Sequence, residues 1–177
     1  MNLSAVTIGV MGSGTDEYGD LARPLGVLLA ELGVNLLTGG GKGVMTAVSR
    51  AFVGDPRRRG ICIGVVPCAS KADRATPKAG YPNAFVELAI FTHLPYSGEQ
   101  GTDDLSRNHV NVLSCAAIVA LPGGPGTAAE VELAIRYRKP VCVYSPNAEL
   151  VRHFPGRLTP ADRIDGVERF LRPYVRS

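Results

Sequence analysis

Short apolar runs alternate with amphipathic stretches along the chain, and this alternation predicts its secondary structure. Apolar, β-branched runs predict strands at residues 5–10, 34–37, 60–67, 84–91, 116–121 and 140–144. Apolar residues at helical spacing predict helices at about 16–32, 45–53, 103–114 and 159–170, and another that runs through residues 131–135. Strands that alternate with helices on short connections are typical of a parallel sheet covered on both faces. We therefore expect an α/β fold, with a doubly wound parallel sheet in a single domain over residues 1–177.

Several predicted elements carry signals at their ends. Gly33 follows the first helix and suits the left-handed conformation that closes a helix. Asp103 and Asp104 suit the first turn of the helix at 103–114, where negative side chains are favoured. Thr159 and Pro160 predict the cap and the first residue of the last helix. The long stretch between the third and fourth strands has no periodicity, which predicts a functional loop or flap at 68–82.

Three glycine-rich turns follow predicted strands, so we expect them at the same edge of the sheet. Ligands of such sheets bind beyond the carboxyl ends of the strands, near the reversal of strand order. Glycines let backbone N–H groups approach a phosphate, and a helix N-terminus adds partial positive charge. The residues predicted to bind a phosphate are Gly12, Ser13 and Gly14 in the first turn, Gly39, Gly40, Gly41 and Met45 in and after the second, and Pro122, Gly123, Gly124, Gly126 and Thr127 in the third.

The turns do not match the common nucleotide motifs. The first turn, Gly12-Ser13-Gly14, lacks the third glycine of a dinucleotide fingerprint. The second turn lacks the Ser or Thr that follows the lysine in a P-loop. Lys42 in this turn is placed to help neutralise a phosphate, with a solvated loop lysine as the equal alternative.

A carboxylate close to the third turn is the most informative feature of the sequence. Glu130 lies one turn beyond Thr127, and helical side chains tilt toward the N-terminus, so it should face the phosphate site. Near a helix N-terminus it should also stay ionised. Arg107, early in the predicted helix at 103–114, is expected at the same edge, where its guanidinium can grip a phosphate at two points.

Arg107 and Glu130 together fit the cleavage of a ribose–base bond. Departure of the base leaves an oxocarbenium-like sugar, which a neighbouring carboxylate stabilises while it orients water. The glycine turns and Arg107 would meanwhile hold the 5′-phosphate. The alternative is a buried structural ion pair between Arg107 and Glu130, and their spacing in the sequence does not separate the two interpretations.

Composition narrows the class of protein. A hydrophobic content of 45% with 20% charged residues is typical of a soluble globular protein, and a net charge of +3 is too small to indicate nucleic acid binding. No apolar stretch is long enough to span a membrane and no signal peptide is evident, so we expect a cytoplasmic protein without a membrane partner. The run Arg57-Arg58-Arg59 is interpreted as a solvated loop, with phosphate contact as the minority view.

Cysteines and histidines indicate neither a metal site nor a cofactor. The cysteines have no metal-type spacing and are expected to be small core residues in a reducing compartment: Cys62, Cys68, Cys115 and Cys142. The histidines share no ligand spacing and are expected at the surface or in loops: His93, His109 and His153. His109 could approach the site from the helix that carries Arg107, but nothing in the sequence requires it.

The nine residues from Pro122 to Glu130 match P-G-G-x-G-T-x-x-E, the signature of the LONELY GUY (LOG), or lysine-decarboxylase-like, family. The chain resembles this family over nearly its whole length, because the Gly-Ser-Gly turn, the glycine loop and the arginine-bearing helix follow in family order. The resemblance implies a Rossmann-like fold and a homodimer or higher homo-oligomer, with sites near the interface. Characterised members are phosphoribohydrolases that release adenine-type bases from nucleoside 5′-monophosphates, and their catalytic arginine and glutamate correspond to Arg107 and Glu130.

One departure from the family pattern makes the chain similar to a sister branch that includes molybdenum-cofactor carrier proteins. The enzymes have Arg-Lys where this chain has Arg107-Asn108, and Asn108 is expected to contribute to the nucleotide site. Two functions stay open. One is hydrolysis of AMP or a cytokinin ribotide to a free base and ribose 5-phosphate. The presence of both Arg107 and Glu130 favours this function. The other is non-catalytic binding or carriage of a phosphorylated ligand such as molybdenum cofactor or a nucleotide.

Overall fold

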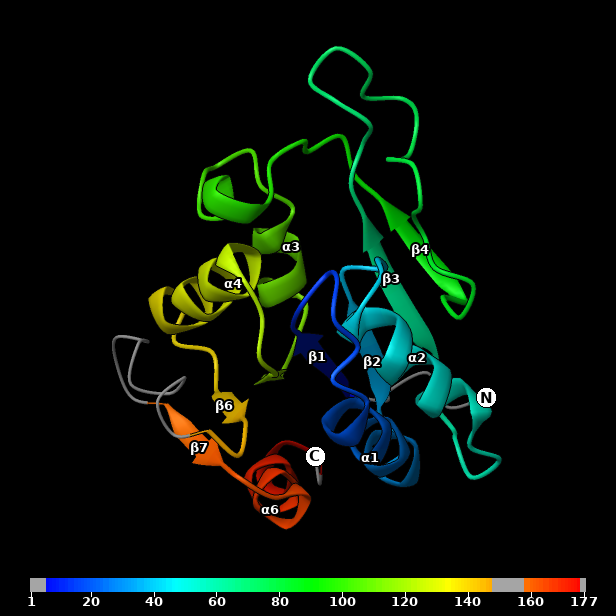
Figure 1. Cartoon of the computed structure of the whole chain (residues 1–177), viewed down its shortest axis with the longest axis vertical. Coiled ribbons are helices and arrows are strands. Elements are labelled where there is room, and N and C mark those ends of the chain that lie inside the picture. The colour runs from blue at the N-terminus through cyan, green and yellow to red at the C-terminus, as the bar shows by residue number, and fades with distance from the viewer. Residues whose placement is uncertain (1–5, 148–157, 176–177) are drawn as a thin grey trace.

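The computed structural model of the protein describes residues 6–147 and 158–175, and its centre is a seven-stranded sheet (Figure 1). The strands lie in the order β4 (Leu88–Phe91), β3 (Cys62–Val66), β2 (Asn35–Thr38), β1 (Thr7–Met11), β5 (Ala117–Ala120), β6 (Val141–Tyr144) and β7 (Thr159–Ala161). Every neighbouring pair is parallel. β1 pairs with β2 on one side and with β5 on the other, so the strand order reverses at β1.

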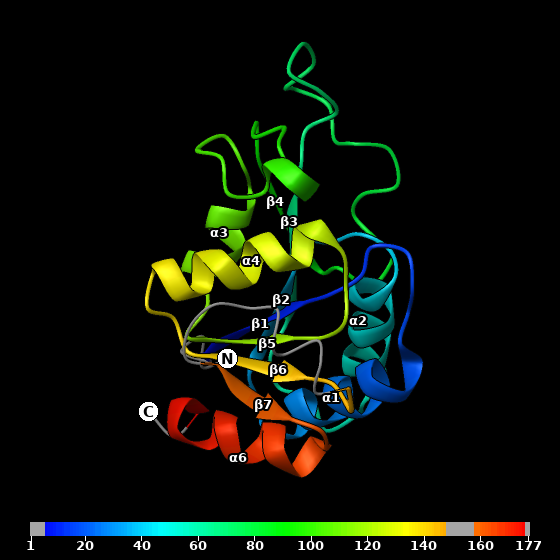
Figure 2. The same ribbon diagram turned by 60° about the vertical axis from the view of Figure 1, so that its left-hand side comes forward.

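Helices cover both faces of this sheet (Figure 2). One face carries α1 (Gly19–Glu31), α2 (Val44–Gly54) and α6 (Ile164–Val175), which bury a core that includes Leu25, Phe52 and Leu171. The other face carries α3 (Asn108–Leu113) and α4 (Pro125–Arg136), packed over a second core that includes Val112 and Leu133. The two cores meet the sheet from opposite sides, as the alternation of side chains along a strand requires. The predicted α/β fold with a doubly wound, Rossmann-like parallel sheet is confirmed.

The six predicted strands are present, with shorter ends. The largest difference is in the predicted strand at 84–91, which begins only at Leu88. The side chain of Asn83 accepts the N–H of Phe85 at 3.1 Å, and its carbonyl accepts the N–H of Val86 at 3.2 Å, so a turn occupies the first half. All four residues of β4 are exposed, and β4 is an edge of the sheet.

The predicted helix at 103–114 is wrong in its first half. Asp103 and Asp104 do not lie in a helical turn, and α3 starts at Asn108. The hydroxyl of Ser106 donates to the carbonyl of Tyr96 at 3.2 Å, which ties this segment to the loop before it. Acidic residues at a helix start are also common in turns, so their presence alone did not locate the helix.

Thr159 and Pro160 do not cap a helix. They belong to β7, which pairs with β6 at the other edge of the sheet, and α6 begins four residues later at Ile164. The missing N–H of a proline is tolerated on an edge strand, because that side of the strand has no partner. The last helix predicted from the sequence is therefore present, but the strand before it was not predicted.

The first helix is shorter than predicted, since α1 starts at Gly19 and not at 16. The hydroxyl of Ser13 binds the N–H groups of Thr15 and Asp16, and Tyr18 has a left-handed backbone with φ 41°. These features keep the segment before α1 as an irregular turn. Gly33 has φ 69° directly after the helix, as predicted.

The segment between β3 and β4 forms the predicted loop, which extends away from the body of the protein (Figures 1 and 2). Its outer part is a short hairpin with an antiparallel bridge between Cys68 and Pro77. Its return path is anchored by Asn83, whose N–H donates to the carbonyl of Gly40 at 2.7 Å and whose side-chain amide donates to Gly41 at 2.9 Å. This anchor brings Tyr81 to the carboxyl edge of the sheet.

All four cysteines are free and buried, as predicted for small core residues. Burial raises the pKa of Cys62 to about 11 and that of Cys115 and Cys142 to about 12. In the described part of the chain, no helix is both long and apolar enough to cross a membrane.

Candidate functional site

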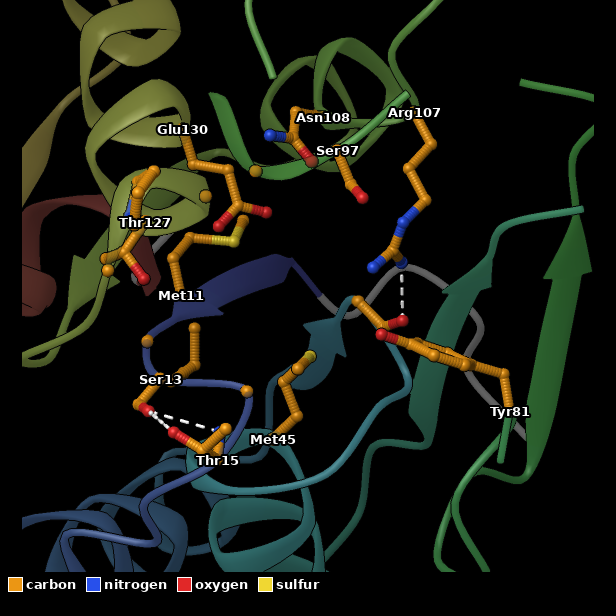
Figure 3. Close-up of a pocket in the computed structure, with 18 residues that line it drawn as sticks. Met11, Ser13, Thr15, Met45, Tyr81, Ser97, Arg107, Asn108, Thr127 and Glu130 are labelled. Atoms are coloured by element: carbon orange, nitrogen blue, oxygen red, sulfur yellow. Dashed lines mark hydrogen bonds between the residues drawn. The ribbon is translucent and has the colours of Figure 1, made fainter. Parts of the chain in front are cut away.

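A cavity of about 360 Å³ lies at the carboxyl ends of β1, β2 and β5, where the strand order reverses (Figure 3). Its walls come from the turns after these strands, the start of α4, the residues at the start of α3, and the loops that carry Tyr81 and Ser97. This is the position at which doubly wound sheets bind ligands.

The turn after β1 joins the other two turns. The N–H of Ser13 donates to the carbonyl of Pro122 at 3.1 Å, and its carbonyl accepts the N–H of Val44 at 2.9 Å. Its hydroxyl accepts the N–H groups of Thr15 and Asp16 at 3.2 and 2.9 Å. Three segments that are distant in the sequence are therefore held together on one side of the cavity.

The turn after β5 depends on glycine at one position. A Cβ on Gly123 would lie 2.1 Å from Oγ1 of Thr127 and 2.8 Å from the backbone nitrogen of Ser13, which leaves no room for a side chain. Pro125 then starts α4, where the absent N–H removes no helical hydrogen bond. Thr127 is 3% exposed and its hydroxyl has no hydrogen-bond partner among the described residues. The N-terminus of a helix is suited to bind an anion.

Glu130 lies three residues after Thr127, on the same side of α4, and its carboxyl group points toward the cavity (Figure 3). It is 9% exposed, and Oε1 accepts a hydrogen bond from Nδ2 of Asn111 at 2.7 Å. Burial raises the pKa of Glu130, and the hydrogen bond from Asn111 and the charge of Arg107 offset only part of this effect. The direction is opposite to the one expected from the helix N-terminus, because loss of water outweighs the helix dipole at this depth.

Arg107 precedes α3 directly and is 6% exposed. Its Nη1 donates to the carbonyl of Gly39 at 2.5 Å and also to the carbonyl of Val65. The guanidinium carbon lies 5.3 Å from the ring centroid of Tyr81. Burial lowers the pKa of Arg107, while Tyr81 and Glu130 act in the opposite direction. The positive charge is thus held by backbone carbonyls and an aromatic ring.

Arg107 and Glu130 face the cavity from different walls and do not form an ion pair (Figure 3). Among the described residues, no carboxylate lies within ion-pair distance of Arg107. The alternative interpretation of these two residues as a structural ion pair is therefore wrong. A buried cation without a carboxylate partner favours an anionic or electron-rich ligand.

Unpaired polar atoms gather around the cavity. In the described part of the chain, the buried side-chain atoms without a partner are Nε of Arg107, Nδ2 of Asn108, Oδ1 of Asn111 and Oγ1 of Thr127. Three of these residues line the cavity, and the fourth, Asn111, contacts Glu130. Most buried polar groups in folded proteins are paired, so the cavity wall is the part of the described chain where buried polar groups are least satisfied.

Most of the residues predicted from the sequence meet at this cavity. Those that line it are Gly12, Ser13, Gly14, Gly39, Met45, Arg107, Asn108, Gly124, Gly126, Thr127 and Glu130. Those that do not line it are Gly40, Gly41, Pro122 and Gly123, which belong to the same turns. Gly40 has φ 71° and lies against Gly64, so its glycine is needed for the backbone. Lys42 is exposed and does not line the cavity.

Other charged residues of interest lie away from the cavity. Arg57 pairs with Asp55 at 2.7 Å and also with Glu31, and Arg58 pairs with Glu87 at 2.7 Å. The nitrogens of His109 contact the hydroxyl of Tyr137 at 2.6 Å and the carbonyl of Asp103 at 2.9 Å. His93 is exposed and does not line the cavity. His153 lies outside the described residues.

The sequence did not predict several residues of the site: Val10, Met11, Thr15, Tyr81, Ser97, Gly98 and Pro125, which line the cavity, and Asn111, which contacts Glu130. Asn111 had a detectable signal, because it lies three residues after Asn108 and so shares its side of the helix. Tyr81 lies in the loop at 68–82 that was predicted to be functional, but no pattern singled out this residue within the loop. Ser97 is in an irregular loop and had no signal. Among the described residues, no group of three His, Cys, Asp or Glu side chains could hold a metal ion.

Known structures share this architecture over almost their whole length. The molybdenum cofactor binding protein from the phototrophic bacterium Rippkaea orientalis is 27% identical, with 98% of this chain and 99% of that chain covered and a TM-score of 0.72. The molybdenum cofactor carrier protein from Chlamydomonas reinhardtii is 30% identical with the same coverage and a TM-score of 0.71. A similarity in sequence also links the chain to an uncharacterized protein from Archaeoglobus fulgidus. The two are 28% identical over 146 residues, which cover 81% of this chain and 83% of the relative.

The family assignment follows from a match that spans most of the sequence. The profile of the SLOG cluster4 family matches residues 5–163, which include every strand described above and all residues that line the cavity. Together with the similar structures, this match confirms the resemblance to LOG-like proteins on the side of the molybdenum-cofactor carriers. The chain belongs to the SLOG cluster4 family.

Proposed function

We propose that the cavity binds a small phosphorylated ligand and that the protein hydrolyses the N-glycosidic bond of a nucleoside 5′-monophosphate. The observation that carries this proposal is the position of Glu130, a buried carboxyl group on the cavity wall one helical turn from the unpaired hydroxyl of Thr127. A site that only held a phosphate would be weakened by a carboxylate so close to the anion.

The phosphate is proposed to bind at the start of α4. Gly124, Gly126 and Thr127 line the cavity there, and Ser13 and Gly14 face them from the turn after β1. The first N–H groups of a helix have no helical partner, and the helix dipole adds to their attraction for an anion.

With the phosphate at that end, the sugar lies beside Glu130. The C1′–N bond breaks with its electron pair leaving on the base, and the carboxylate stabilises the positive charge that develops on the sugar. Water then adds its oxygen to C1′ and transfers a proton to Glu130, which returns it to the departing base or to solvent. Arg107 and Asn108 line the cavity from the α3 side. With the phosphate at the start of α4, Arg107 is proposed to donate to the sugar hydroxyls or the base, and not to the phosphate as expected from the sequence.

The direct test is hydrolysis of AMP and of a cytokinin ribotide, with free base and ribose 5-phosphate as the measured products. Glu130→Gln should lower kcat by about 10²–10⁴-fold, the range for loss of a general base. Glu132→Gln is the matched control, because Glu132 is exposed on the same helix and does not line the cavity. Equal inactivity of wild type and Glu130→Gln, with binding of a phosphorylated ligand retained, would contradict hydrolysis.

The second candidate is a carrier that binds molybdenum cofactor or a nucleotide without turnover. It is favoured by the similarity to two molybdenum cofactor proteins over 98% of the chain, and by Asn108 in place of the lysine of the enzymes. The same phosphate site at the start of α4 would hold the phosphate of such a ligand. Binding of the cofactor without release of any product would support this candidate.

We also propose that the protein forms a homodimer or higher homo-oligomer through β4. This edge strand exposes Leu88, Ile90 and Phe91, with 47%, 37% and 44% of each residue accessible. An apolar sheet edge exposed to water is a site for association.

The net charge of +3 supports a small anion as the ligand and not a nucleic acid.

A further inference from the structure

A fully buried amide is the hydrogen-bond partner of the proposed catalytic carboxylate. Asn111 lies in α3, is 0% exposed and does not line the cavity. Its Nδ2 donates to Oε1 of Glu130 at 2.7 Å, which joins α3 to α4 beneath the site. No other described residue donates a hydrogen bond to the Glu130 carboxyl group.

This contact leaves the two oxygens of Glu130 in different situations. Oε1 is engaged by Asn111, whereas Oε2 accepts no hydrogen bond from the described residues. Oε2 is also absent from the unpaired atoms that are fully buried, so it reaches open space. Because Glu130 lines the cavity, Oε2 is the oxygen available to a ligand or a water molecule.

The carbonyl oxygen of the Asn111 amide, Oδ1, is buried and has no hydrogen-bond partner in the described chain. A residue that served only to pack α3 against α4 would be apolar, since an unpaired buried acceptor is unfavourable. Nδ2 of Asn111, by contrast, donates to the carboxylate, and a hydrogen bond to an ionised group is stronger than one to a neutral group. Asn111 therefore favours the ionised form of Glu130.

We propose that Asn111 is the positioning residue of the site, which fixes Oε1 of Glu130 and presents Oε2 to the sugar of the ligand. This inference rests on the proposed function for the identity of the ligand. The effect of Asn111 on the pKa of Glu130 is independent of the proposed function.

Few other charged groups surround this carboxylate. Arg107 at the start of α3 and the thiol of Cys115 just after α3 interact with it electrostatically. β1 and β5 present only apolar or glycine residues to this region. In η1 (Gly98–Gln100), which packs against α4, the acidic residue Glu99 is exposed. Asn111 is thus the group whose removal should change the titration of Glu130 without changing local charge.

The test follows the Glu130 carboxyl signal by carbon NMR during a pH titration of the full-length protein labelled with carbon-13 glutamate. Glu130→Gln identifies the signal. Asn111→Leu, of similar size but without a donor, should raise the midpoint, with proton affinity about tenfold higher, because the ionised form loses its hydrogen bond. Val112→Ala is the matched control, since it removes packing from α3 at a buried position without touching the carboxylate, and its midpoint should equal that of wild type.

Two outcomes are decisive. An unchanged midpoint in Asn111→Leu overturns the proposal, and Asn111→Ser provides the same measurement if the leucine variant does not fold. In the hydrolysis assay, Asn111→Leu should lower kcat at unchanged KM, because Asn111 does not contact the ligand. If wild type hydrolyses no nucleotide while the midpoint shifts as expected, the proposed function fails and the role of Asn111 toward Glu130 stands.

Discussion

At the scale of single residues, the site combines groups that are unfavourable for folding. Glu130 is a buried carboxyl group with one hydrogen bond, and Arg107 is a buried cation with no carboxylate partner in the described chain. Burial of each charge opposes its ionised form. Such groups persist where a ligand uses them, and functional sites are often less stable than their surroundings for this reason.

Replacing Glu130 by glutamine should therefore stabilise the ligand-free protein at neutral pH. The pKa of Glu130 is raised in the folded state by burial, so the folded state binds the proton more tightly than the unfolded state. Stability from this group is complete below the unfolded pKa and is lost as pH rises through the folded pKa. Glu130→Gln removes this loss, and a gain on the order of 1 kcal/mol would raise Tm by about 2–4 °C.

The measurement is Tm as a function of pH for wild type, Glu130→Gln and the exposed control Glu132→Gln. The advantage of Glu130→Gln should grow from acid to neutral pH, while the control should follow wild type. A constant difference between wild type and Glu130→Gln at all pH values would contradict a raised pKa.

At the scale of elements, the strand-turn-helix units could be predicted from the sequence. The residues at which some helices and strands begin, and the loops that reach the site, could not. The apolar runs at β1, β2, β3, β5 and β6 and the glycine turns after them located the cavity, because parallel strands bring their carboxyl ends to one edge. The late start of α3 was not predictable, since it depends on the bond between Ser106 and Tyr96. β7 was hidden because a Thr-Pro pair also suits a helix start. Tyr81 entered the site only through the anchoring of Asn83 on the second turn.

The third turn gives a prediction at this scale. Gly123→Ala should destabilise the protein by about 1–3 kcal/mol, the usual result of overpacking, because the new methyl group would overlap Thr127 and the backbone of Ser13. Gly124→Ala should have an effect within about 0.5 kcal/mol, because no atom lies within 4 Å of its Cβ position. Urea unfolding of both variants is the measurement. Equal losses at the two positions would show that the contact at Gly123 is not what requires glycine.

At the scale of the whole molecule, the sheet has two unequal edges. β7 is followed by α6, which packs against it, whereas the four residues of β4 are exposed. The helices that cover the centre of the sheet do not extend over β4 (Figures 1 and 2). An uncovered edge with apolar side chains is the surface at which a second copy is proposed to bind.

The double variant Leu88→Asn and Ile90→Asn should therefore shift the protein to a smaller species. Both side chains lie on one face of β4, so polar groups there disfavour burial in an interface. Light scattering coupled to size-exclusion chromatography measures the mass. Tyr18→Asn is the matched control, because it removes a side chain that is 42% exposed elsewhere and asparagine tolerates the left-handed backbone at this position. A wild-type mass equal to that of one chain would refute assembly through β4.

The central position of β1 also has a consequence during synthesis. β1 and its neighbour β2 are close in the sequence, whereas its other neighbour, β5, comprises residues Ala117–Ala120. A nascent chain that ends before this point therefore carries an incomplete sheet with the apolar strand β1 as an open edge, available for pairing with other chains. Docking of β5 closes this edge of β1 and also brings the turn that begins α4 to the wall of the cavity.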